Sequence, residues 1–262
     1  MSEVVILRDG LHSELGPSAA ERWLNCPGSV LASRGVHSPQ KEYAAEGVAA
    51  HSLSEWARQE GKPVSHWKGT VIKVDEFEFK VGKAFIEGVQ KFVDACAAVP
   101  GDPQYETMVH YQQIVPDGFG TLDDARLRSG LGVVTDLKYG KGVKVFAKDN
   151  PQLMLYALGL FFQWDWLYGF QKFVMRINQP RLNHYEEDEI KVGQLLEWAY
   201  DYVRPKAALT QEEGAPIRAG GWCKFCKIKA TCTARAQYKQ EWESAGRGTR
   251  TAESEFVNMD TT

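Results

Sequence analysis

The chain has 262 residues, of which 44% are hydrophobic and 25% are charged, and its formal net charge at pH 7 is −3. A chain of this size can bury a substantial core, and its net charge alone does not indicate a nucleic-acid partner. It contains no run of eighteen apolar residues, and its start lacks the basic and apolar stretches of a signal peptide. We therefore expect no transmembrane helix, no membrane partner and a cytoplasmic location.

The first hundred residues are expected to be mainly helical. Ser18-Ala-Ala-Glu21 is a capping-box sequence, which predicts a short helix over 19–25 with Cys26 at its end. Apolar spacing predicts a second helix over 42–60, which carries His51, and a long amphipathic helix over 75–98.

The character of the sequence then changes to strands. Alternating apolar residues and turn residues favour strands in the middle of the chain, with helices after them and a polar tail from Glu241 onward. Residues 143–146 either continue the third strand or form a short one. The expected strands cover 105–114, 121–128, 131–139 and 169–178, and the expected helices cover 150–162 and 187–209.

Ser129-Gly130 is a plausible two-residue hairpin turn between the second and third strands. If Arg128 pairs with Leu131, the numbers of cross-strand partners sum to 259, so Asp123 faces Asp136. Asp124 then pairs with Thr135 on the opposite face of the sheet. A loop with a bulge would change this register.

Two carboxylates that face each other destabilise a sheet unless a positive charge lies between them. Lys138 is two residues beyond Asp136 and therefore projects from the same face. The arrangement favours a divalent cation beside the lysine. The alternative is that one acid is simply exposed on an edge strand, although Val133-Val134 favours a central strand.

Four of the five cysteines have the spacing of a metal site. Cys223, Cys226 and Cys232 form a C-x2-C-x5-C group, and Cys26 lies near the start of the chain. Thiols stay reduced inside cells, which favours metal over disulfides, and four thiolates suit either zinc or an iron–sulfur cluster. Cys96 is interpreted as a small buried hydrophobic residue.

Basic residues occur in two runs. Residues 217–239 contain six Lys or Arg residues and no acid, and a shorter run contains Lys138, Lys141, Lys144 and Lys148. Such runs can bind phosphates, or they can be a solvated face. Trp222 and Phe225 lie among the cysteines, where shielding of a cluster is a better interpretation than stacking on a base.

Taken in order, these residues resemble the RecB-like branch of the PD-(D/E)XK nuclease superfamily in its iron–sulfur form. Similar proteins include CRISPR-adaptation nucleases, AddB-type nuclease domains and phage or prophage exonucleases. Each motif is weak singly, but their order over most of the chain is specific. The motifs are Cys26, Glu46-Gly-Val-Ala-Ala-His51, Gly120-Thr-Leu-Asp123, Asp136-Leu-Lys138, Gln152 with Tyr156, and Cys223, Cys226 and Cys232.

The resemblance implies an α/β, restriction-endonuclease-like fold with a central mixed β-sheet flanked by helices. A single domain would span residues 1–240, with 241–262 as a polar tail. A four-cysteine cluster, [4Fe–4S] in preference to Zn2+, would join the N-terminal and C-terminal segments.

The resemblance also implies a site for Mg2+ or Mn2+ held by His51, Asp123, Asp136 and the backbone carbonyl of Leu137. Lys138 would position a water molecule or stabilise the transition state. Gln152 and Tyr156 would orient the lysine or the nucleic-acid backbone, and Glu46 is a weaker candidate acid.

The implied function is a metal-dependent DNA nuclease, an exonuclease more than an endonuclease, acting in phage or bacterial recombination, repair or processing. A phage- or prophage-encoded protein of the bacterial cytoplasm fits this role. The sequence has no G-x-x-x-x-G-K-[ST] phosphate loop, so an annealing protein or a helicase would be a separate partner. The alternative is a catalytically inactive nuclease fold that serves as a DNA-binding or adaptor module with a structural Fe–S or Zn site.

Overall fold

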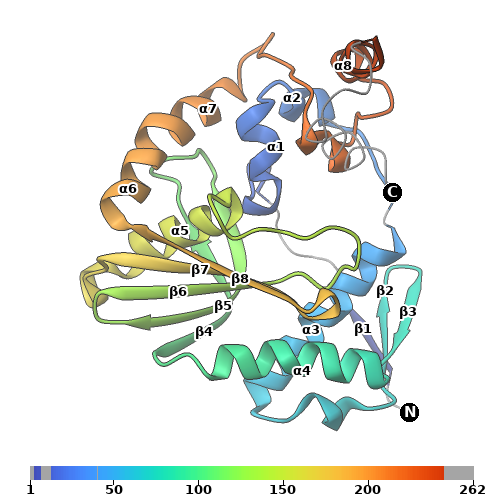
Figure 1. The fold of residues 1–262 in the computed structure, drawn as a ribbon, viewed down its shortest axis with the longest axis vertical. Coiled ribbons are helices and arrows are strands. Elements are labelled where there is room, and N and C mark those ends of the chain that lie inside the picture. The colour runs from blue at the N-terminus through green and yellow to red at the C-terminus, as the bar shows by residue number, and fades with distance from the viewer. Residues whose placement is uncertain (1–2, 7–12, 40, 245–262) are drawn as a thin grey trace. The chain divides into compact units, whose positions relative to one another are not determined.

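The computed structural model describes residues 3–6, 13–39 and 41–244 (Figure 1). The chain divides into two compact units, each built from three segments. The first unit contains residues 1–12, 39–111 and 119–196, and the second contains 13–38, 112–118 and 197–262. The expectation of one domain over 1–240 stays a prediction. Residues 245–262 of the expected polar tail lie outside the described residues.

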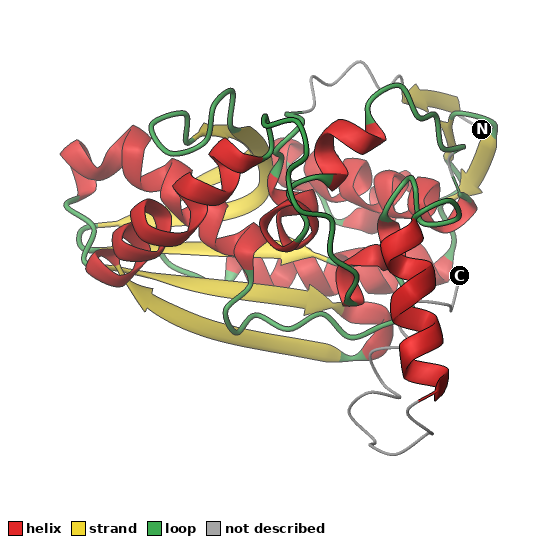
Figure 2. Ribbon diagram, turned by 90° about the horizontal axis from the view of Figure 1, so that it is seen from above, coloured by secondary structure: helices red, strands yellow, loops and turns green. Residues whose placement is uncertain are grey.

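The first unit contains a five-stranded mixed sheet with the strand order β4-β5-β6-β7-β8. Strands β6 and β7 are parallel, and the other neighbours are antiparallel. The predicted α/β fold with a mixed sheet and flanking helices is confirmed (Figure 2). The strands are β4 (Asp102–His110), β5 (Phe119–Arg128), β6 (Leu131–Leu137), β7 (Lys172–Gln179) and β8 (His184–Lys191).

Helix α5 (Pro151–Tyr168) connects the parallel strands β6 and β7 and packs against four strands of this sheet. Helix α5 can approach β4 closely because Gly159 has no side chain. A Cβ atom built at Gly159 would lie 2.7 Å from the Cβ atom of Val109 on β4.

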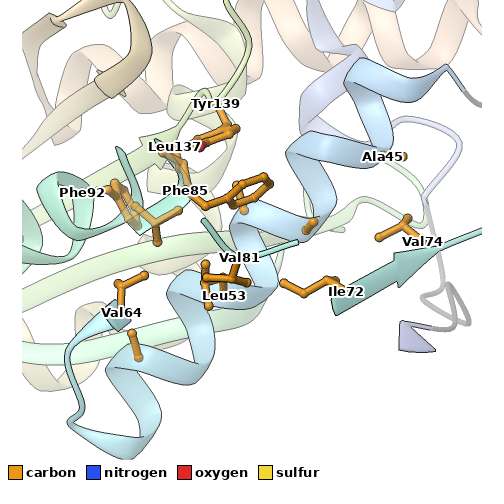
Figure 3. Close-up of a cluster of buried hydrophobic side chains, with 14 of the residues drawn as sticks. Ala45, Leu53, Val64, Ile72, Val74, Val81, Phe85, Phe92, Leu137 and Tyr139 are labelled. Carbon is orange, nitrogen blue, oxygen red and sulfur yellow. The ribbon is translucent and has the colours of Figure 1, made fainter. Parts of the chain in front are cut away.

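A second sheet and two helices form the other core of the first unit (Figure 3). Leu53, Ile72, Phe85 and Phe92 are among its buried side chains, and Leu137 at the end of β6 joins them. Burial of this apolar surface therefore fixes the end of the strand that carries Asp136. The elements are β1 (Glu3–Ile6), α3 (Glu42–Glu60), η2 (Val64–Trp67), β2 (Val71–Val74), β3 (Phe77–Lys80), α4 (Lys83–Ala97) and η3 (Pro180–Leu182).

The second unit is helical in its described part. Helix α1 contacts α7 and η5, which brings the end of α1 close to the cysteine segment. Helix α6 (Val192–Glu197) ends at the first residue of the unit's last segment. The elements are η1 (Pro17–Ala19), α1 (Ala20–Asn25), α2 (Ser29–Ser33), the π-helical η4 (Trp198–Val203), α7 (Arg204–Leu209), η5 (Gly221–Phe225) and α8 (Thr233–Ser244).

Two predicted helices begin later than expected. The helix expected over 75–98 begins only at Lys83, because Phe77–Lys80 pairs with β2 as a strand. Phe77 and Phe79 contact the core at a period of two, which was read as part of a helical pattern. The helix expected over 187–209 begins at Val192, because the acidic stretch before it pairs with β7.

Other local predictions differ in detail. The helix after residue 19 is present, but its N-cap is Ala19 and no side chain caps it, so the capping box does not form. Residues 143–146 are a loop and not a strand. Where the structure describes the chain, no helix has the length and apolar character needed to cross a membrane.

The hairpin register is confirmed. Arg128 pairs with Leu131 and Asp124 pairs with Thr135, so the partner numbers sum to 259 as predicted. Strand β6 lies in the middle of the sheet, which excludes the interpretation of Asp136 as an acid on an edge strand.

We expect Gly159→Ala to lower the free energy of unfolding, although alanine is the better helix former. The helix-propensity gain of about 1 kcal/mol is opposed by a clash with Val109 that costs about 1–3 kcal/mol. Gly47→Ala in α3 is the matched control, because its Cβ would meet nothing within 4 Å and should stabilise the fold. Urea unfolding of both variants measures the difference, and a stabilised Gly159→Ala protein would contradict the close packing.

Candidate functional site

Three side chains from three different elements converge in the first unit. They are His51 on α3, Glu106 on β4 and Asp123 on β5, and their ligand atoms all lie within 4.8 Å of one another. His51 Nδ1 lies 3.0 Å from Asp123 Oδ1. Within residues 3–6, 13–39 and 41–244, this is the only such group of three His, Cys, Asp or Glu side chains.

Glu106 is the member that the sequence reasoning missed. Tyr105 pairs with Asp124 and Thr107 pairs with Leu122, so Glu106 lies across from Asp123. Its backbone has a positive φ of 44°, which interrupts the regular ladder at this point. The signal for Glu106 in the sequence was an acidic residue inside an expected strand. The connection from β4 to β5 is long, so the sequence did not determine the register of this strand pair.

Asp123 is 7% exposed and is fixed by the neighbouring strand. Its Oδ2 accepts a hydrogen bond of 2.6 Å from the backbone amide of Leu137. This bond holds the Asp123 side chain beside Asp136, as the hairpin register predicted. Ligation by the carbonyl of Leu137 stays a prediction.

The other predicted residues form one connected polar group. Lys138 Nζ lies 2.9 Å from Asp136 Oδ2 and donates a 2.9 Å hydrogen bond to Gln152 Oε1. Gln152 Nε2 donates to Asp136 Oδ1 at 2.9 Å and to Tyr156 Oη at 3.3 Å. Gln152 thus sets the distance between the lysine and the carboxylate.

The start of α5 fixes Gln152. The Asn150 side chain accepts hydrogen bonds from the backbone amides of Gln152 and Leu153, and Pro151 occupies the first turn. This is a side-chain N-cap with proline at its favoured position, and it holds the helix end in register. Tyr156 follows one turn later on the same face.

Arg58 on α3 supports this group of side chains through hydrogen bonds to β4 and β5. Its guanidinium group lies between the rings of Phe92 and Tyr105, with its central carbon 5.1 Å and 5.2 Å from their centroids. It donates to the backbone carbonyl of Asp123 at 2.7 Å and to Glu106 Oε1 at 3.2 Å. His51 and Arg58 are seven residues apart on α3, so two turns of one helix carry both groups.

The buried charges change the acidity of one another. Burial lowers the pKa of His51, but the carboxylate of Asp123, with those of Glu106 and Asp136, outweighs burial and raises this pKa to about 9. Burial and Asp123 raise the pKa of Glu106 to about 8. Burial also raises the pKa of Asp136, whereas His51 and the Leu137 amide outweigh burial at Asp123 and lower its pKa.

The donor set fits a divalent cation. Carboxylate oxygens and one imidazole nitrogen suit Mg2+ or Mn2+. Asp136 Oδ2 is buried, and the ammonium group of Lys138 lies 2.9 Å from it. A carboxylate oxygen has two lone pairs, so Asp136 Oδ2 can accept a cation beside the lysine. Glu46 does not join this group, because it is paired with Arg181.

The four predicted cysteine ligands lie in the second unit, around one small cavity. All are free thiols, and the backbone amide of Arg218 lies 3.2 Å from Cys26 Sγ. No three of their sulfur atoms approach one another within 4.8 Å in the described part of the chain. The cluster that would join the terminal segments is therefore not shown. The cysteines are Cys26, Cys223, Cys226 and Cys232.

The residues beside the cysteines partly differ from expectation. Trp222 lines the cavity and donates to the backbone carbonyl of Arg218 at 2.9 Å. Phe225 is 72% exposed, so it does not shield the cavity as predicted. Cys96 is buried in the first unit, as predicted.

Binding of Mn2+ to the first unit is expected to release protons. Ligands bind a metal in their deprotonated form, whereas at pH 7 His51 and most of Glu106 are protonated, because their pKa values are about 9 and about 8. Roughly one to two protons should leave at pH 7, and the apparent affinity should rise with pH towards 9. Calorimetry in two buffers of different ionisation enthalpy measures the release. An affinity that is constant between pH 6 and 9 would rule out these ligands.

Comparison with known proteins shows the family of the chain and a weak likeness to a solved structure. The chain is similar to the protein in "Crystal structure of SSO0001", with 16% sequence identity over 87% of this chain and 90% of that chain. The TM-score is 0.40, which is too low to transfer fold or function. A family model described as "Protein of unknown function (DUF2800)" matches residues 12–256. The chain therefore belongs to the DUF2800 family.

Proposed function

We propose that this protein is a metal-dependent DNA nuclease of the RecB-like PD-(D/E)XK type. One observation carries the proposal: His51, Glu106 and Asp123 converge within 4.8 Å, on a sheet whose next strand presents Asp136 and Lys138. Three acids and a lysine carried by neighbouring strands, with a half-buried histidine, are unusual unless a cation and an anionic substrate meet there.

His51, Glu106, Asp123 and Asp136 would hold Mg2+ or Mn2+. When bound, such an ion acidifies a water molecule and neutralises charge on a phosphodiester. Lys138 supplies a positive charge where the scissile phosphate gains negative charge, and its bond to Gln152 fixes its direction. Tyr156 Oη accepts a hydrogen bond from Gln152 Nε2, and both side chains would help to orient the lysine or the nucleic-acid backbone.

The biological role that we propose is exonucleolytic processing of DNA in phage or bacterial recombination or repair. It rests on the order of the sequence motifs, because exonucleases of this type carry the same series. A helicase or an annealing protein would supply strand separation or pairing.

We further propose that the cysteine cavity holds a [4Fe–4S] cluster. Zinc binds thiolates at about 2.3 Å in a tetrahedron, which places the sulfurs roughly 4 Å apart. No three of the described cysteine sulfurs have such a spacing. A polynuclear cluster accepts more widely separated ligands, and the order of the sequence motifs favours iron–sulfur over zinc.

Asp136→Asn and Glu106→Gln should each lower the rate of DNA cleavage roughly 100-fold or more, because a ligand charge is lost without a change of shape. End-labelled single-stranded and duplex DNA with Mg2+ or Mn2+, and with EDTA, measures this rate. Glu189→Gln is the matched control, since Glu189 pairs only with the exposed Lys172. An inactive adaptor would shift the DNA on a gel without shortening it, and full activity of Asp136→Asn would refute the proposal.

The anaerobically purified protein should be brown and contain iron and acid-labile sulfide. Cys26→Ser should lose most of the iron, whereas Cys96→Ser should keep it, because Cys96 is buried in the other unit. Elemental analysis of the three proteins distinguishes the outcomes. A colourless protein with stoichiometric zinc would contradict the iron–sulfur proposal and support a zinc site.

A further inference from the structure

Residues 140–150, here called the lysine loop, begin and end at the candidate metal centre. The loop starts two residues after Lys138 and ends two residues before Gln152, and both of these side chains belong to the polar group around Asp136. It carries three exposed lysines, and its only acid is Asp149 near its end. The lysines are Lys141, Lys144 and Lys148.

The side chains of Gln179 and His184 bond to the backbone of the lysine loop at Val143 and Val145. Gln179 is 1% exposed, and its side chain accepts from the amide of Val145 at 2.7 Å and donates to the carbonyl of Val143 at 3.0 Å. His184 Nε2 lies 3.0 Å from the carbonyl of Val145. These bonds support the loop backbone on both sides of Lys144.

Phe146 directly follows Val145 in the lysine loop and is 58% exposed. One edge meets His184 at 5.8 Å between ring centroids, which fixes the ring without covering it. A supported loop that carries an exposed aromatic ring and three exposed lysines has the two parts of a single-strand binding surface: a stacking platform and cations for the backbone.

The position of the lysines gives a further reason for this assignment. They stand on the segment that joins Lys138 to Gln152, so their charge attracts a phosphate backbone towards the candidate metal centre.

We propose that the lysine loop binds the single-stranded end of a nucleic acid beside the metal centre. Lys141, Lys144 and Lys148 contact phosphates, and Phe146 stacks on an unpaired base. The choice of nucleic acid as the ligand rests on the proposed function, while the loop surface and the preference for unpaired bases go beyond it.

The test measures binding of the full chain to a fluorescein-labelled thymidine oligonucleotide by anisotropy in EDTA, where no cleavage occurs. A blunt duplex of the same length is the second ligand. The variants are Phe146→Leu, Phe146→Tyr, the triple lysine-to-glutamine protein and Gln179→Ala. Trp166→Leu is the matched control, because Trp166 is 80% exposed on α5 outside the loop. Circular dichroism verifies that each variant is folded.

Phe146→Leu should weaken single-strand binding roughly five- to a hundred-fold, because it removes one stacked base. Phe146→Tyr and Trp166→Leu should bind like the unaltered protein, and Phe146→Leu should leave duplex binding unchanged. Loss of three phosphate contacts should reduce the slope of log affinity against log salt by about 2. Gln179→Ala should weaken binding because the loop loses its support.

Three results would overturn the inference: no single-strand binding by the unaltered protein, Phe146→Leu and triple lysine-to-glutamine proteins that bind within twofold of it, or an equal loss on duplex DNA for Phe146→Leu. The proposed function fails separately. A protein that binds DNA through the loop but never shortens it with Mn2+ would keep the inference and lose the nuclease. A protein that cuts DNA while its Phe146→Leu and triple lysine-to-glutamine variants bind normally would keep the proposed nuclease and lose the inference.

Discussion

Repulsion among the two buried acids Asp123 and Asp136 and the half-buried Glu106 is the interaction on which the rest of this site depends. Glu106, Asp123 and Asp136 share one region of the sheet from which water is largely excluded, and ionised groups there destabilise one another unless compensated. Compensation comes from His51, from Lys138 and from the Leu137 amide. The opposite pKa shifts of Asp123 and Glu106 follow from this shared charge. A cation bound there, as we propose, would stabilise such a site, and folding stability is commonly exchanged for function in this way.

The need to compensate the charge of these acids also explains the surroundings of Arg58. A guanidinium group that bonds to Glu106, to Asp124 and to the backbone of Asp123 ties β4 and β5 to helix α3. Phe92 and Tyr105 exclude water from it, so these bonds are stronger than they would be at the surface. The helix that delivers His51 therefore also supports the strands that deliver the acids. The apolar core reaches the other side of the site through Leu137, which directly follows Asp136.

Comparison of particular elements shows which kinds of sequence signal were reliable. The hairpin at Ser129-Gly130 was predicted correctly, with its register, because a two-residue turn leaves little freedom in strand pairing. The strand β8 was misread as helix, since four of its residues are acidic and helix propensity favours glutamate. Cross-strand ion pairs, such as Arg176 with Glu187, instead stabilise it as a strand. Phe77 and Phe79 were misassigned because a short alternating stretch adjoined a true amphipathic helix.

The sequence by itself determined what local geometry controls. It placed Asp123 beside Asp136, put Lys138 on the same face, and set Gln152 and Tyr156 one turn apart, because strand and helix periodicity act over a few residues. Only the tertiary structure decided that Glu106 and His51 reach Asp123. Their meeting depends on how α3 and β4 pack against β5, and packing between distant segments is fixed by the whole core rather than by any local pattern. The same reason applies to the cysteines, whose spacing along the chain gave four candidate ligands but not the distances between their sulfur atoms.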